Sequence, residues 1–261
     1  MAIPILDATT YLQTMSSGRT KPCLFICESV EDKTNTEYVV KLKAGMETSV
    51  DGLSFELIAS LLASFFDLPT PEPALVRIDP MLADCIPDPE LSTRIKKSAG
   101  LNYGSSFLSG GYKTWPTEKS LSTNTRISAL EIFAFDALIQ NPDRRSAKPN
   151  ILWKSDTIYI IDHEMAFSFI LDIFPRSNPW KISDLEFLRS HLFYSKLKGQ
   201  VLELDRFAGA LETVTADVLS SITESVPEEW KSPKIKIVEN HILEVCAHSN
   251  EFIDELRRIL V

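Results

Sequence analysis

The chain has 261 residues, of which 44% are hydrophobic and 24% are charged. This composition is typical of a globular chain, and the length allows one large domain or two lobes. The net charge of −9 argues against a broad basic surface for nucleic acid, so no direct nucleic-acid binding is expected. We find no run of about 18 apolar residues and no secretory signal pattern, and we therefore expect a cytoplasmic protein without a membrane span.

The first third of the chain combines strand patterns with one helix pattern. Residues 21–30 and 38–42 are rich in apolar and β-branched residues and are separated by a polar stretch, which predicts a hairpin. Residues 53–66 are mostly apolar and predict an amphipathic to fully buried helix. A proline-rich connector then leads to a predicted strand over 74–78. Residues 80–125, with frequent prolines, serines and glycines, are expected to be irregular.

The remainder is predicted to be mostly helical. The apolar residues 127–140 predict a core helix, which ends at the turn Asn141-Pro142-Asp143. After a basic loop, two short strands over 150–153 and 157–161 form a predicted hairpin. Further helices are expected over 183–197, 203–223 and 235–260.

This order of elements predicts an α+β fold with two lobes. A small lobe of antiparallel strands with one helix is expected over residues 1–79. A mostly helical lobe that contains the hairpin is expected over residues 80–261. We expect a ligand in the cleft between the two lobes.

Five polar residues occur in the order that phosphoryl transfer requires. Asp143 follows the core helix, and a hairpin would bring Asn150 and Asp162 together because its two ends are adjacent. One carboxylate can orient or deprotonate a hydroxyl group, while amide and carboxylate oxygens can hold Mg²⁺ against a triphosphate. Upstream, a strand lysine, Lys41, can neutralise phosphates, and a helix glutamate, Glu56, can hold that lysine in place.

Each of these residues also has an ordinary structural interpretation. Asp143 alone could be a turn residue after a helix, and Asp162 a residue that ends a strand. Lys41 could extend its ammonium from an edge strand into solvent, and Glu56 could interact only with the helix dipole. The ordered set is more specific than any single member.

Several segments resemble the HipA-like kinases, in particular their short stand-alone group. NPDRR, PNILW and IYIIDHEMAF, between residues 141 and 167, resemble the catalytic and metal-binding segments of that family. YVVKL, FELIASLLASFFDLPTPEPALVRI and LNYGSSFL, between residues 38 and 108, resemble its front half. The later segments are also similar to type II phosphatidylinositol 4-kinases. The likeness extends over roughly residues 36–170.

The resemblance implies a bilobed protein-kinase-like or phosphatidylinositol-kinase-like fold that uses ATP and Mg²⁺. It implies a serine/threonine protein kinase with an unknown hydroxyl-bearing acceptor, and some relatives suggest an antitoxin-like partner. By position, it implies nucleotide binding by Lys41, Glu56, Val76, Ile78 and Asp79, catalysis by Asp143, and metal binding by Asn150 and Asp162. The segment from Val76 to Asp79 is expected to contact the adenine through backbone groups.

The sequence departs from the family pattern at three places. Lys148 stands where the family has an asparagine five residues after the catalytic aspartate, which leaves Asn150 to take the metal-binding role. The loop over residues 28–36 has no glycine to surround phosphates, so its Thr34, Asn35 or Thr36 would have to supply donors. His163 and Glu164 follow Asp162, with His163 interpreted as structural or as a catalytic base.

Three further points stay open at the level of sequence. Arg144 and Arg145 could steady the transferred phosphate or could be solvated loop charges. Lys148 leaves open a pseudokinase, a module that binds a nucleotide or a partner without turnover. A small-molecule or lipid kinase is a further alternative, although the acidic net charge and the lack of a basic amphipathic helix argue against stable membrane docking.

Overall fold

The computed structural model describes residues 3–15, 20–173 and 176–261, and within it the chain divides into two compact units. The first unit consists of Met1–Ser60, Pro71–Ser109 and Glu224–Lys231. The second consists of Leu61–Thr70, Gly110–Thr223 and Ser232–Val261. The first unit therefore extends past the predicted boundary at residue 79, because a strand that follows this point pairs with strands before it.

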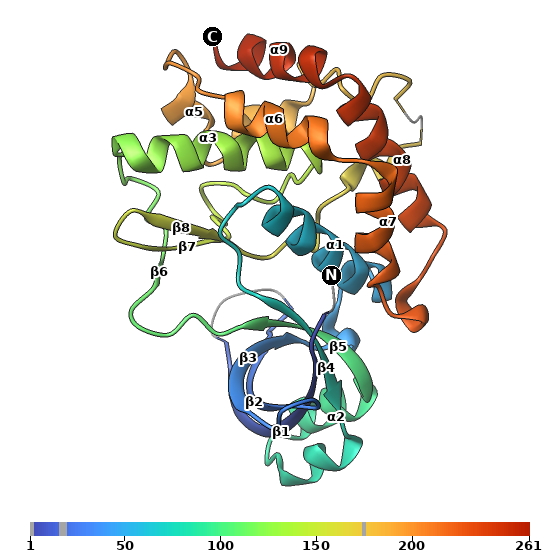
Figure 1. Cartoon of the computed structure of the whole chain (residues 1–261). Helices are drawn as coiled ribbons and strands as arrows, with labels where there is room; N and C mark the ends of the chain where they lie inside the picture. Colours follow the sequence, from blue (N-terminus) through green and yellow to red (C-terminus); the bar gives the residue numbers. More distant parts are fainter. Residues whose placement is uncertain (1–2, 16–19, 174–175) are drawn as a thin grey trace. The chain divides into compact units, whose positions relative to one another are not determined.

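A closed barrel of five strands forms the centre of the first unit (Figure 1). In barrel order the strands are β1 (Ile5–Thr14), β2 (Cys23–Ser29), β3 (Asn35–Lys41), β5 (Gly100–Ser106) and β4 (Pro73–Ile78). Side chains that alternate along the strands fill the interior, where Phe25, Val40 and Val76 are fully buried. Neighbouring strands are antiparallel except for β1 and β4, which run parallel with Leu6 opposite Val76. The predicted antiparallel arrangement therefore holds for four of the five pairings, and the unpredicted strand β1 adds the parallel pairing that closes the barrel.

Helix α1 (Val50–Phe65) is buried along nearly its whole length, which confirms the helix predicted over residues 53–66. The prediction of an irregular stretch over 80–125 was wrong in large part. That stretch holds a 3-10 turn (Pro80–Cys85), helix α2 (Pro89–Lys97) and β5. Two of its prolines, Pro80 and Pro89, begin helical turns, which Asp79 and Asp88 cap.

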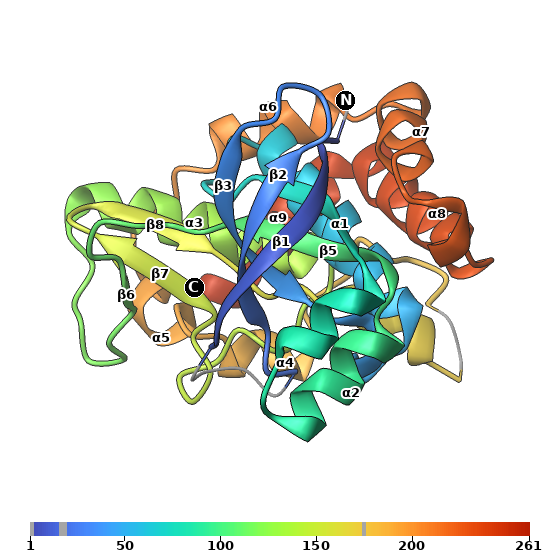
Figure 2. The same ribbon diagram turned by 90° about the horizontal axis from the view of Figure 1, so that it is seen from below.

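In the second unit, helix α3 (Thr123–Leu138) lies beside a small sheet, as both views show (Figure 1 and Figure 2). The sheet has the order β6 (Lys113–Thr114), β7 (Ile151–Lys154) and β8 (Thr157–Ile160). The core helix and the hairpin predicted from the sequence are thus confirmed. Eleven of the sixteen residues of α3 are buried, so this helix forms the core of the unit.

The remaining helices are shorter than the sequence predicts. They are α4 (Glu186–Ser190), α5 (Tyr194–Leu197), α6 (Asp205–Thr213), α7 (Ala216–Glu224), α8 (Lys234–Ala247) and α9 (Ser249–Leu260). The break between α4 and α5 falls at His191, whose extended backbone ends the first of these helices. The break between α6 and α7 falls in the β-branched run Thr213–Thr215, which disfavours helix continuation. Within the described residues, no helix combines the length and apolar character that a bilayer crossing requires.

Candidate functional site

The first unit holds a buried ion pair between Lys41 and Glu56. Lys41 is the last residue of β3 and Glu56 lies in α1, and Nζ and Oε2 are 3.0 Å apart. The side chains are 9% and 2% exposed. Removing two charges from water is costly, so a pair of this kind is weak evidence for stability and is often retained for another reason. The structure thus brings together the two residues that the sequence selected for phosphate binding.

In the turn between β2 and β3, the donors of Thr34 are already engaged. The backbone N–H and the hydroxyl of Thr34 both donate to the carboxylate of Asp32, over 3.1 and 2.7 Å. These bonds lower the pKa of Asp32, so the turn carries a negative charge at its tip. The expectation that Thr34 supplies phosphate donors is therefore wrong.

The segment from Val76 to Asp79 is part of the barrel and of the turn that follows it. Val76 and Ile78 are buried inside the barrel, and β4 pairs with β1 on one edge and with β5 on the other. Asp79 caps the following 3-10 turn by accepting the N–H of Met81 at 2.8 Å. Ladder pairing on both edges occupies the backbone groups of Val76 and Arg77, so these two residues do not offer them to an adenine. The adenine contacts of Ile78 and Asp79 stay a prediction.

In the second unit, one ammonium group connects two carboxylates. Lys148 Nζ lies 2.5 Å from Asp143 Oδ2 and 3.0 Å from Asp162 Oδ2. Asp143 also accepts from the Asn150 amide at 3.2 Å and from the Arg145 guanidinium at 3.3 Å. The structure therefore gathers the three residues that the sequence selected for catalysis and metal binding, together with the lysine that departs from the family pattern.

Two of these residues have an uncommon backbone conformation. Asn150, just before β7, and Asp162, two residues after β8, have φ values of 50° and 61°, in the left-handed region. The Ile161 N–H donates to the Asn150 carbonyl at 3.0 Å, which continues the hairpin ladder to this end. Asn and Asp are among the residues that tolerate this region best, and residues held there cluster at functional sites.

A buried ion pair beneath the loop fixes its shape. Arg144 Nε and Asp136 Oδ2 are 2.5 Å apart, and neither side chain is exposed. The same guanidinium donates to the carbonyls of Asn150 at 2.5 Å and Ile161 at 3.3 Å. It therefore connects α3 with the residue before β7 and the residue after β8, at the open end of the hairpin. His191 Nε2 completes the cluster at 2.9 Å from Asp136 Oδ2. Arg144 is thus neither a solvated loop charge nor a side chain available to a phosphate.

The protonation of this cluster follows from its contacts. Burial alone raises the pKa of Asp136, but Arg144 and His191 together lower this pKa to about 2. Burial lowers the pKa of His191, so the ring is neutral at pH 7. Its Nδ1 accepts the N–H of Phe193 at 3.1 Å, which leaves Nε2 to carry the proton that faces Asp136.

The two residues after Asp162 are also buried. His163 is 1% exposed and packs edge-on against Phe135, with 6.4 Å between ring centroids. Its carbonyl accepts the N–H of Ala166 at 2.9 Å. Glu164 is 5% exposed. These contacts fit the structural interpretation of His163 better than that of a catalytic base.

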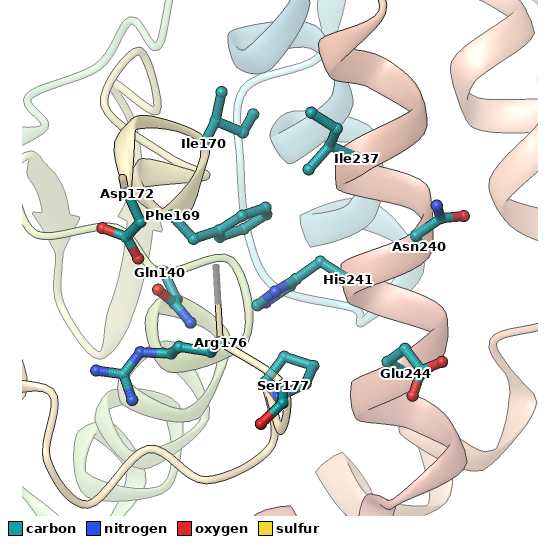
Figure 3. A pocket seen from close by; sticks show the side chains of 11 residues that line it. Gln140, Phe169, Ile170, Asp172, Arg176, Ser177, Ile237, Asn240, His241 and Glu244 are labelled. Carbon is teal, nitrogen blue, oxygen red and sulfur yellow. The ribbon is translucent and has the colours of Figure 1, made fainter. Parts of the chain in front are cut away.

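A separate open pocket of about 260 Å³ lies elsewhere in the second unit (Figure 3). Phe169 and His241, whose rings stack at 3.8 Å, lie in its wall together with Gln140 and Arg176. It contains neither Asp143 nor Asp162, and the His241 Nε2 bonds to the carbonyl of Leu138 at 3.1 Å. This pocket therefore does not belong to the carboxylate cluster.

Comparison with known proteins places these features in a family. A solved structure of the Helicobacter pylori proinflammatory kinase CtkA is similar to this chain, with 12% identity, a TM-score of 0.55, and coverage of 100% of this chain and 99% of that one. A structure of the Neurospora crassa PAN3 pseudokinase is similar with 12% identity, a TM-score of 0.37, and coverage of 99% and 67%. No curated protein matches the sequence significantly.

The likeness to CtkA shows a kinase-like fold. The sequence model of the family described as HipA-like kinase matches residues 9–254 and so includes both units. The chain belongs to the HipA-like kinase family.

Proposed function

We propose that this chain is an ATP-dependent phosphotransferase that transfers a phosphoryl group to a hydroxyl group of a protein, as a serine/threonine kinase does. The observation that supports it most is the gathering of Asp143 and Asp162 around one ammonium group at the end of a rigid hairpin. Phosphoryl transfer depends mainly on positioning and on charge, and the buried Arg144 positions this loop. The family match supports the same proposal.

Each candidate residue has a role in this proposal. Asp143 orients the accepting hydroxyl and takes its proton, and Lys41, held by Glu56, contacts the phosphates. The cytoplasmic location, the antitoxin-like partner and the similarity to type II phosphatidylinositol 4-kinases stay predictions.

Magnesium, which the resemblance implies, does not fit the residues as they lie. The Lys148 ammonium lies 3.0 Å from Oδ2 of Asp162, so it occupies the space beside the carboxylate to which the resemblance assigns the metal. Mg²⁺ takes oxygen ligands in a near-octahedral arrangement, and an ammonium group offers none.

One observation favours a second function, nucleotide binding without turnover. Lys148 forms an ion pair with Oδ2 of Asp143, the residue proposed as the base, and Arg145 donates to Oδ1, so both oxygens that could receive a proton are already engaged. A pseudokinase of this kind would keep the fold and the nucleotide site. It would lose only the transfer step.

The test is incubation of the purified chain with γ-labelled ATP, with label transfer and ATP consumption followed over time. Asp143→Asn should reduce both by about 100-fold or more, as expected for loss of a general base. Its control is Asp156→Asn, which changes an exposed carboxylate in the turn at the opposite end of the hairpin and should leave both rates unchanged.

Wild-type rates in the Asp143→Asn variant would contradict the proposed role of this residue. If the wild-type chain binds ATP in calorimetry but transfers no label, the second function is correct. If it neither binds nor consumes ATP, both proposals are wrong.

A further inference from the structure

The carboxylate cluster of the second unit already contains its own cation. Lys148 reaches Asp143 and Asp162 at the same time, and its side chain is 33% exposed. The side chain is an ammonium group fixed by two short ion pairs.

The surrounding groups are arranged for this ammonium rather than for a metal ion. Asn150 directs its amide nitrogen, not its oxygen, toward Asp143. Arg145 adds a second positive charge on the other oxygen of the same carboxylate. A divalent cation placed against Asp162 would be repelled by the Lys148 ammonium, which lies 3.0 Å from this carboxylate.

A nucleotide phosphate brings several negative charges, and two carboxylates near it would repel these charges unless a cation intervenes. Here Lys148 forms ion pairs with Asp143 and Asp162, and Arg145 forms a second ion pair with Asp143, so two cations balance the two negative charges. An ammonium group has three donors, and the exposed part of Lys148 allows it to contact a phosphate oxygen as well.

We propose that Lys148 takes the place of the divalent metal ion in this site, so that the chain binds the phosphates of a nucleoside di- or triphosphate without Mg²⁺. This inference rests on the proposed function, because it concerns the same nucleotide. It adds one point to that function, namely which cation of the site contacts the phosphates. Lys148 then gives the site a cation that contacts the phosphates, in addition to removing the asparagine of the family pattern.

Calorimetry with ADP and with a non-hydrolysable ATP analogue tests the inference, each in excess EDTA and in millimolar Mg²⁺. The wild-type Kd should agree within about threefold between the two conditions. Lys148→Met, which keeps the length of the side chain and removes its charge, should weaken binding at least about tenfold in EDTA. Lys148→Asn should also bind weakly in EDTA and should regain affinity in Mg²⁺, because it supplies an oxygen ligand.

The matched control is Lys154→Met, which removes an exposed lysine from the far end of β7 and should bind like the wild type in both conditions. Thermal unfolding of each variant checks that it is folded. Mg²⁺-dependent binding by the wild type, tenfold or more, would overturn the inference and leave the proposed function intact. Wild-type affinity of Lys148→Met in EDTA would also overturn it. Absence of nucleotide binding in both conditions would overturn the proposed function, and the inference with it.

Discussion

Arg144 and Asp136 form an ion pair that is completely enclosed, with 2.5 Å between Nε and Oδ2 and no exposed side-chain surface on either residue. The guanidinium also binds the two backbone carbonyls that precede and follow the hairpin, at Asn150 and Ile161. The shape of the candidate site therefore depends on a group that cannot touch a substrate. Arg144 is a positioning residue, and its loss should be visible in stability as well as in activity.

Replacing Arg144 by Met should lower the free energy of unfolding by about 3–5 kcal/mol, because Asp136 would keep a buried charge with only His191 beside it. Urea denaturation followed by circular dichroism measures the change. The matched variant is Arg145→Met, whose side chain is 54% exposed and whose loss should cost at most about 1 kcal/mol. Equal losses in the two variants would show that the buried pair has no special role.

Replacing Lys41 by Met should weaken nucleotide binding by about 10- to 100-fold, the effect of losing a charged hydrogen bond of about 1.5–3 kcal/mol. Calorimetry with ADP measures the loss. Lys33→Met is the control, since this lysine is exposed and pairs with Glu28 in the β2–β3 turn. If Lys41→Met binds ADP like the wild type, the Lys41–Glu56 pair is structural and does not contact phosphate.

The stability of the second unit should fall as the pH is lowered from about 6.5 to about 4. Burial lowers the pKa of His241 from 6.5 to about 4 in the folded chain, so the unfolded chain binds the proton first. Between pH 7 and pH 5 this linkage amounts to about 2 kcal/mol. Burial lowers the pKa of His191 as well, which acts in the same direction.

His241→Gln tests this linkage, because glutamine does not titrate and can still donate to the carbonyl of Leu138. Urea unfolding at pH 7 and pH 5 should show a smaller pH dependence in the variant, by about 2 kcal/mol. An unchanged pH dependence would mean that His241 does not become protonated on unfolding in this range.

Two glycine positions should respond to alanine in opposite directions. A Cβ on Gly104, in β5, would lie 2.5 Å from Cγ2 of Val76 inside the barrel, so Gly104→Ala should lower stability by about 1–3 kcal/mol. A Cβ on Gly209, within α6, would meet nothing within 4 Å, so Gly209→Ala should raise stability by about 0.5–1 kcal/mol. Thermal and urea unfolding of both variants provide the measurement, and the same sign in both would contradict this account of the barrel packing.

The elements that the sequence predicts well are those with one dominant pattern. Helix α3 and the β7–β8 hairpin follow from long apolar runs and from a short polar turn. The sequence does not predict strand β1 because polar residues such as Thr9, Thr10 and Gln13 interrupt its apolar pattern. The sequence does not predict helix α2 because the prolines near its start are also typical of irregular segments, although Asp88 before Pro89 is a typical cap.

In the candidate site, too, the sequence predicts features that depend on local patterns and misses contacts between residues far apart in the chain. The order of residues along the chain is enough to pair Lys41 with Glu56 in the first unit and to bring Asp143 and Asp162 together in the second, since elements of known type carry them. The sequence does not distinguish Arg144 from Arg145, because the two differ only in burial: Arg144 is enclosed and holds the loop, whereas Arg145 is exposed. The bond between Asp136 and His191 joins residues 55 positions apart, which no local pattern reveals.

The short segment Glu224–Lys231 belongs to the first unit although more than a hundred residues separate it from the rest of that unit. Trp230 in this segment is completely buried, and its carbonyl accepts the hydroxyl of Ser54 at 2.8 Å. During synthesis on the ribosome, the barrel unit would therefore stay incomplete until nearly the whole chain had been made. A fragment that ends at residue 109 would expose the surface that Trp230 covers, so the unit cannot be dissected by a single cut.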